Sequence, residues 1–140
     1  MKKPGLLALV LIVAGCGSSG SSTPTTQASV DPRCIAATST LIQLLGVTVV
    51  TGVNMDNVYY VKSNAYPNVY FISGRLQGGS VGSSPKVATW VTNRSDGSSG
   101  FFTVDPNSVQ YSGWGPATNT GNNYTMSDDG AALSATCAAG

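Results

Sequence analysis

The chain has 140 residues, with seven Lys and Arg residues against six acidic residues, and its formal net charge at pH 7 is +1. It contains no histidine, which excludes the Ser-His-Asp and Cys-His arrangements of nucleophilic catalysis and removes the commonest ligand of catalytic zinc. The few charges are scattered along the sequence, so the basic patch that binds nucleic acid is absent and we expect no nucleic-acid partner.

Residues 1–15 have the organisation of an export signal. Two lysines precede the apolar run 6–14, which has the length of a signal-peptide core and is too short for a membrane span of about 20 residues. The run ends in Val13-Ala14-Gly15-Cys16, which resembles the lipobox of bacterial lipoproteins. This resemblance implies cleavage before Cys16 and a diacylglyceryl thioether, carrying palmitate-like chains, on its sulfur. An ordinary secretory signal that happens to contain a cysteine is the alternative.

Residues 16–30 are predicted to be the lipidated cysteine and a flexible tether. Residues 17–29 are almost wholly Gly, Ser and Thr, a composition that cannot bury a hydrophobic core. A tether of this length has a root-mean-square reach of roughly 20 Å. Because two acyl chains suffice for stable anchoring, we expect the mature protein on the extracytoplasmic side of the cell membrane, with the lipid on Cys16 as its membrane contact.

Residues 31–140 form one predicted domain, which is large enough for a single modest core. With Cys16 lipidated, Cys34 and Cys137 remain as a pair near the two ends of this domain. Disulfides persist in exported proteins, and redox-active pairs are usually close together in the sequence. We therefore expect a structural disulfide between Cys34 and Cys137.

The domain is expected to open with a helix over residues 31–46. Asp31 is a good N-cap and the proline after it suits the first helical position. Apolar residues at three- and four-residue spacing then form one stripe, with Cys34 at its inner edge, and Gly46 is a natural stop. Residues 47–53 are β-branched and fit either a strand or a buried connection.

Four strand-like runs follow, at residues 58–62, 69–76, 86–93 and 101–104, each rich in β-branched and aromatic residues. The linkers between them consist of turn-forming residues and are too short for parallel crossovers, so we expect an antiparallel meander. The linker at 95–100 is the tightest hairpin candidate.

Two further helices are predicted after these strands. Asp105 and the following proline repeat the cap signal and start a short helix to Tyr111. The acids at 128–129 stand where a helix dipole favours them, so residues 131–138 are predicted to form a helix, with a strand over 132–137 as the alternative. The predicted fold class is α+β: an antiparallel β-sheet meander with an N-terminal and a C-terminal helix packed on one face of it and linked by one disulfide.

The six aspartates are the only acidic side chains, and paired carboxylates support glycoside hydrolysis. Each of them has a structural explanation, however. Asp31 and Asp105 are predicted helix caps, and Asp96 is a turn residue. Residues 128–129 are first-turn acids, and Asp56 is predicted to lie in a loop before the first strand.

Ser83-Ser84-Pro85-Lys86 matches the S-x-x-K pattern of penicillin-binding proteins and β-lactamases, where the serine attacks and the lysine assists. In those enzymes the serine starts a helix, whereas the proline and the strand that follows it here predict a loop. The K-T-G motif that completes such a site is also missing. We expect no catalytic residues and no enzymatic activity; a small envelope hydrolase using aspartates or the Ser83/Lys86 pair is the alternative.

Oxygen ligands suited to Ca²⁺ stand at Asn54, Asp56 and Asn57 and at residues 128–129, but their spacing matches no EF-hand loop. We expect neither a metal nor a cofactor. The aromatic side chains are the remaining candidates for ligand binding, because in an exported binding module they can stack on sugar rings or hold an apolar ligand, although most such residues fill and rim a core. They are Tyr59, Tyr60, Tyr66, Tyr70, Trp90, Tyr111, Trp114 and Tyr124.

A succession of short motifs resembles a group of small exported or membrane-anchored actinobacterial proteins that have no assigned activity. The resemblance covers residues 58–130; it implies a shared fold and transfers no catalytic residue. Its motifs are Tyr70-Phe71-Ile72-Ser73, Thr89-Trp90-Val91-Thr92-Asn93, Val104-Asp105, Ser112-Gly113-Trp114-Gly115 and Asp128-Asp129-Gly130. We therefore expect a membrane-anchored lipoprotein that is a non-enzymatic binding or interaction module of the cell envelope, with a cell-envelope ligand or a protein as its partner.

Overall fold

The computed structural model describes residues 30–140 of the chain. The predicted signal peptide, the lipobox with Cys16 and the tether as far as residue 29 lie outside the described residues. Within the described range, none of the helices combines the length and the apolar character that crossing a membrane requires.

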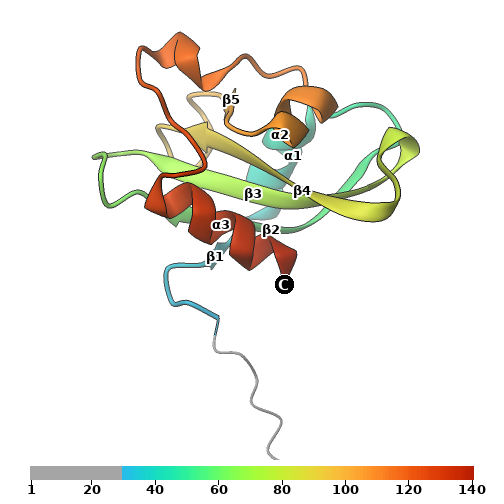
Figure 1. Cartoon of the computed structure of the whole chain (residues 1–140), viewed down its shortest axis with the longest axis horizontal. Helices are drawn as coiled ribbons and strands as arrows, with labels where there is room; N and C mark the ends of the chain where they lie inside the picture. The colour runs from blue at the N-terminus through green and yellow to red at the C-terminus, as the bar shows by residue number, and fades with distance from the viewer. Residues whose placement is uncertain (1–29) are drawn as a thin grey trace, which may run out of the picture.

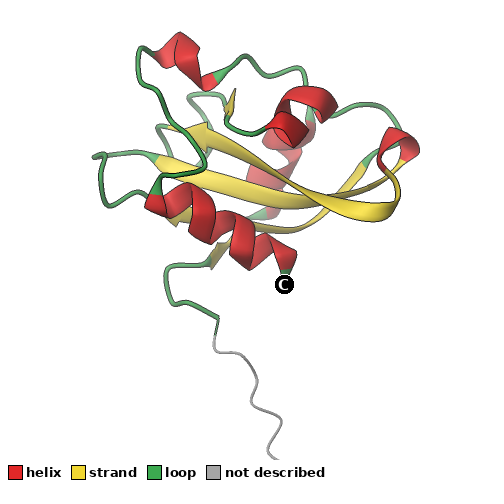
Figure 2. Cartoon of the chain, viewed as in Figure 1, coloured by secondary structure: helices red, strands yellow, loops and turns green. Residues whose placement is uncertain are grey.

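A five-stranded antiparallel sheet forms the centre of the domain, and its strands follow one another in chain order from edge to edge (Figures 1 and 2). The three middle strands form two long hairpins, and the two edge strands are short. This arrangement, together with helices near both ends of the domain, confirms the predicted α+β class and the meander. The elements are β1 (Ile35–Ala36), α1 (Ser39–Gly46), β2 (Asn54–Lys62), β3 (Tyr70–Gly78), β4 (Gly82–Thr92), β5 (Phe102–Thr103), α2 (Pro106–Tyr111) and α3 (Asp129–Ala139), with 3₁₀ turns η1 (Gly79–Val81) and η2 (Ala117–Thr120).

The turn between β3 and β4 is tighter than the sequence predicts. Gly78 pairs with Gly82, and only η1 lies between them, so most of the linker expected at residues 78–85 belongs to strands. Gly79 has a φ of +50°, and a Cβ added there would lie 2.8 Å from the carbonyl carbon of Gly52, so this close approach requires glycine. The prediction of the tightest hairpin at 95–100 is wrong, because a longer connection joins β4 to β5.

The two faces of the sheet carry separate cores, because side chains alternate along each strand. Ile72 and Trp90 are cross-strand partners in the core beneath α1 and α2. Phe71 and Val91 are partners in the other core, which α3 covers, and Ala131 of α3 is buried in it. The prediction that both terminal helices pack on one face is therefore wrong: α1 and α3 lie on opposite sides of the sheet (Figure 1).

The first helix begins later than predicted. Thr38 is its N-cap, and the Thr38 hydroxyl accepts a hydrogen bond from the backbone N–H of Leu41 at 3.2 Å. Asp31 instead closes a turn, where its carboxylate accepts the N–H of Arg33 at 2.8 Å. The residues between these two caps include β1, which pairs with β2 along the sheet edge. Pairing with a distant strand thus overrides the local cap-then-proline signal. The segment 47–53 forms turns with an isolated bridge to the end of α2.

The two later helices are confirmed. Asp105 caps α2 through a capping box: its carboxylate accepts the N–H of Ser108 at 3.0 Å, and the Ser108 hydroxyl accepts the N–H of Asp105 at 3.2 Å. At the C-terminal end, α3 forms where the helix is predicted, so the alternative strand is wrong.

The predicted disulfide between Cys34 and Cys137 is present, with a Cα–Cα distance of 6.0 Å and 103 residues of sequence separation. Cys137 lies on α3, as expected. Cys34, however, lies just before β1 rather than on a helix. The bond therefore joins the start of the described chain to α3, on the face of the sheet that α3 covers.

Candidate functional site

Each aspartate carboxylate accepts a hydrogen bond, and for most of the six this bond gives the aspartate a structural role. Asp96 holds a turn and Asp105 holds a helix start, as predicted, whereas Asp31 holds a turn instead of the predicted helix start. Asp128 accepts the N–H of Thr125 at 2.8 Å, just before α3. None of these contacts assembles two carboxylates around a shared cleft.

Asp56 lies within β2 and not in a loop before it, which corrects the prediction. It stands opposite Arg75 of β3, and the two side chains form a bidentate ion pair at 2.7 and 3.2 Å. The amide of Gln77 also donates to Asp56 at 2.9 Å. The hydrogen bond from Arg75 lowers the pKa of the Asp56 carboxyl below its ordinary value, and the carboxylate is fully engaged.

The Ser83/Lys86 pair does not form a catalytic arrangement in this structure. Both residues lie in β4, which corrects the predicted loop, and both are exposed. Three residues of extended strand separate their Cα atoms by about 10 Å, whereas one helical turn would bring them together. Among the residues that the structure describes, no hydrogen bond joins the Ser83 hydroxyl to the Lys86 ammonium group.

The oxygen ligands considered for a metal also have other partners. Asp56 is occupied by Arg75 and Gln77, and Asp129 pairs with Arg33 at 2.6 Å. Within residues 30–140, no three His, Cys, Asp or Glu side chains converge on one point.

Most of the aromatic candidates are accounted for by packing. Trp90, Tyr111 and Tyr124 are buried, and Tyr66 packs edge to face on Tyr124 with ring centroids 5.0 Å apart. Trp114 packs on Phe101 in the same way, and its indole N–H donates to the carbonyl oxygen of Leu45 at 3.0 Å. Three partly exposed rings remain, those of Tyr59, Tyr60 and Tyr70.

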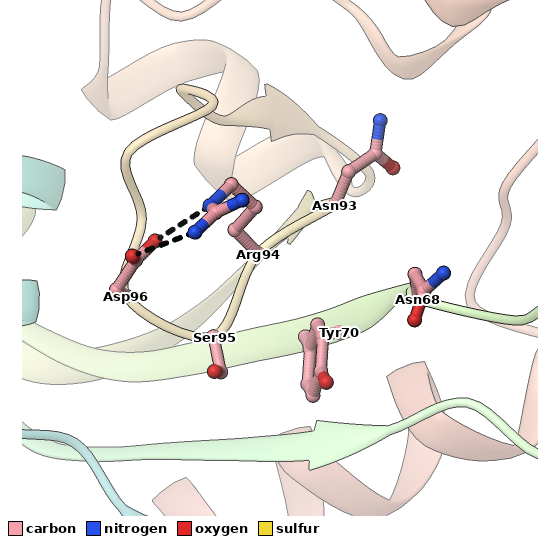
Figure 3. Close-up of a pocket in the computed structure, with 6 residues that line it drawn as sticks. All are labelled: Asn68, Tyr70, Asn93, Arg94, Ser95 and Asp96. Carbon is pink, nitrogen blue, oxygen red and sulfur yellow. Dashed lines mark hydrogen bonds and ion pairs between the residues drawn. The ribbon is translucent and has the colours of Figure 1, made fainter.

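Tyr70 lies in a polar pocket of about 410 Å³ at one end of the sheet. Figure 3 shows that the pocket is built from two neighbouring segments, the start of β3 and the chain that leaves β4. Because Tyr70 pairs with Thr92, continuing the same antiparallel register places Asn68 opposite Arg94. The lining residues are Asn68, Tyr70, Asn93, Arg94, Ser95 and Asp96.

The loop on the β4 side of the pocket is held in place by several contacts. The N–H of Gly97 donates to the carbonyl oxygen of Arg94 at 3.0 Å, and the hydroxyls of Thr92 and Ser99 are 3.0 Å apart. Gly97 is buried with a φ of +74°, and a Cβ added there would lie 2.6 Å from the ring of Phe101. The loop is therefore anchored on the core beneath α1, and the pocket opens on that face of the sheet.

The two charged groups of the pocket neutralise one another. Arg94 and Asp96 form an ion pair with N–O distances of 3.3 and 3.4 Å, and their side chains are 63% and 57% exposed (Figure 3). Hydrogen bonds from Ser98, chiefly from its backbone N–H, and then from Arg94 lower the pKa of Asp96 to about 2. Asp96 is therefore ionised at neutral pH and acts only as an acceptor.

A second hollow, of about 490 Å³, lies on the other face of the sheet, beside the disulfide. Tyr59 of β2 and Leu133 of α3 form its walls, and Val30, the first described residue, lies at its margin. Both ends of the described chain border this hollow, because Gly140 also lines it. It marks the side of the domain on which the described chain begins and ends.

The chain matches no protein-family model, no curated protein and no solved structure. The resemblance to exported actinobacterial proteins and the resemblance of the N-terminal region to a lipobox both stay predictions.

Sequence reasoning names Tyr70 as one aromatic candidate among eight and does not find the rest of the pocket. Asn68 and residues 95–96 lie in segments that the sequence predicts to be turns, and Asn93 is the last residue of a predicted strand. Their contribution to a shared pocket depends on the register of two strands, and the sequence does not reveal that register. The signal that was available is a set of amide and charged side chains at the start of the second predicted strand and at the end of the third.

Proposed function

We propose that this protein is a membrane-anchored, exported lipoprotein whose domain binds a component of the cell envelope without catalysing its turnover. The observation that carries the proposal is the pocket at Tyr70, where one aromatic ring stands among six lining side chains that otherwise offer hydrogen bonds. An aromatic ring that can carry a ligand and polar groups that fix its orientation are two components of small-molecule sites.

The occupied carboxylates favour binding over hydrolysis. A glycosidase needs two carboxyl groups about 5–10 Å apart across one cleft, and the pocket contains a single carboxylate, Asp96, whose partner is Arg94. A pKa of about 2 also makes Asp96 a poor general acid at neutral pH.

The position of the pocket fits an anchored protein. The described chain begins beside α3, whereas Tyr70 shares the face of Ile72 and the core beneath α1. With the tether attached on the α3 side, the pocket is turned away from the attachment point. This geometry would leave the pocket accessible on a domain held close to a membrane.

Co-sedimentation with isolated envelope tests the proposal. The full mature chain, in a mild zwitterionic detergent, is mixed with insoluble cell-envelope material of an actinobacterium, and the pellet is assayed for the protein. We expect the wild-type chain to sediment and the Tyr70→Ala variant to stay largely in solution. Tyr59→Ala is the matched control, because Tyr59 is also a partly exposed strand tyrosine but lies on the other face.

The same incubation tests the alternative of a hydrolase. Mass spectrometry of the supernatant should show no soluble fragments released over time by the wild-type chain. Released fragments that are lost in an Asp96→Asn or Ser83→Ala variant would contradict the non-enzymatic part of the proposal, and failure of the wild-type chain to sediment would contradict the binding part.

A further inference from the structure

We infer that the pocket at Tyr70 takes an uncharged pyranose ring, as found in a neutral envelope polysaccharide. The inference rests on the proposed binding function and narrows it to a class of ligand. It depends on three features of the pocket: its charge balance, its mixture of donors and acceptors, and its supported aromatic ring.

The charge balance favours a neutral ligand over an acidic one. Arg94 is the one cation among the six lining residues, and it is already paired with Asp96. Because the pKa of Asp96 is about 2, the pair carries no net charge at neutral pH. An acidic sugar would have to displace Asp96 from Arg94 or lie close to its negative charge, and a neutral sugar meets neither cost.

The hydrogen-bonding groups match hydroxyl groups, each of which both donates and accepts. Asn68 and Asn93 present carboxamides with two N–H donors and one acceptor oxygen each, and both residues are exposed. Asp96 supplies a permanent acceptor, and the Arg94 guanidinium has N–H groups beyond the two that reach Asp96. Among the six side chains drawn in Figure 3, the Arg94–Asp96 pair is the one interaction marked, so neither carboxamide is paired with another lining side chain.

The ring of Tyr70 has an aromatic neighbour that restricts its movement. Tyr60 of β2 packs against it edge to face, with the centroids 6.1 Å apart and the planes at 71°. A ring fixed in this way loses little freedom when a ligand stacks on it, so its apolar face contributes to binding at low entropic cost. Pyranose rings have an apolar face of C–H groups that suits such a platform. The pocket volume of about 410 Å³ lies within the range of small-molecule sites.

A titration followed by NMR tests the inference on the full mature chain in the same sugar-free detergent. The probes are the methyl glycosides of glucose, mannose and galactose, and the acidic comparator is methyl glucuronide. We expect saturable shifts of the backbone amides of Asn68, Tyr70 and residues 93–96 with at least one neutral probe and weaker effects with the glucuronide.

The variants separate the contributions to binding. Tyr70→Ala should weaken binding about tenfold, because the ring covers roughly 50 Å² of apolar sugar surface, and Tyr59→Ala should leave it unchanged. Asp96→Asn should weaken binding of the neutral probe and strengthen binding of the glucuronide, because the substitution leaves Arg94 without its negative partner. Should Tyr70→Ala fail to fold, Asn93→Ala, at an exposed position, replaces it with an expected loss of a few-fold in affinity.

The two proposals fail in distinguishable ways. Tighter binding of the glucuronide than of every neutral probe overturns the inference. The inference is also overturned if no probe gives a saturable shift while the protein still sediments with the envelope in a way that depends on Tyr70. The proposed binding function then stands, with a ligand of another class. Absence of both sugar binding and sedimentation overturns the inference and the proposed function together.

Discussion

Removal of the disulfide should cost the domain a large part of its stability. The bond between Cys34 and Cys137 closes a loop over 103 residues of sequence separation, nearly the whole described chain. On the chain-entropy model, a loop of about 100 residues contributes about 4.7 kcal/mol by restricting the unfolded state, and measured values are commonly 2–4 kcal/mol. Single domains unfold at a cost of about 5–15 kcal/mol, so the double variant Cys34→Ser, Cys137→Ser should be markedly less stable.

Urea unfolding followed by tryptophan fluorescence measures this effect, because Trp90 of β4 is fully buried in the core beneath α1 and α2. We expect the double variant to lose at least about 2 kcal/mol and its m-value to rise, since the unfolded chain is no longer cross-linked. Wild-type protein in a reducing agent is the control and should behave like the variant. Unfolding free energies that agree within about 0.5 kcal/mol between variant and oxidised wild type would refute the reasoning.

Three further perturbations test the packing, the capping and the electrostatics of the domain. Gly130→Ala should lower the unfolding free energy by about 1–3 kcal/mol, because the added Cβ would lie 2.7 Å from the buried ring of Phe71. Gly46→Ala, with open space around the added Cβ, should be neutral or stabilising by up to about 1 kcal/mol. Chemical denaturation of both variants measures the difference. Asp105→Ala should cost about 2–4 kcal/mol in the same assay, because it removes the cap of α2 and leaves a buried amide of β4 without its acceptor. The chemical shift of the Asp96 carboxyl carbon, followed by NMR, should titrate with a midpoint of about 2. Because this folded-state pKa is lowered from 3.8, the contribution of Asp96 to stability is present above pH 3.8 and is lost as the pH falls through about 2. A midpoint near 3.8 would contradict the contacts with Ser98 and Arg94.

The sequence predicts the sheet well because its strands carry a strong local signal. Alternation and β-branched residues identify β2, β3 and β4, and short linkers exclude parallel crossovers. The start of α1 is predicted wrongly because two caps compete. Asp31 with its proline is the stronger local signal, but the residues after it pair with β2 and reach the disulfide, so Thr38 becomes the cap.

The arrangement of the helices could not be predicted in the same way. An amphipathic stripe shows that α1 buries one side, but it does not say which face of the sheet receives that side. The strands β3 and β4 are apolar on both faces, as Phe71 and Ile72 show for β3 and residues 90–91 for β4, and this pattern indicates cover on both sides. The pocket depends on register in a similar way, because Asn68 and Arg94 are close only through the pairing of Tyr70 with Thr92.

Mass spectrometry of the N-terminal peptide of the mature protein, extracted from membranes, tests the central claim of an anchored envelope protein most directly. The account predicts that Cys16 is the first residue and carries a diacylglyceryl group, and that Cys16→Ser abolishes the lipid while the domain still folds, because residues 30–140 contain both cores and the disulfide. An unmodified Cys16 thiol, or a mature chain that begins elsewhere, would contradict the account.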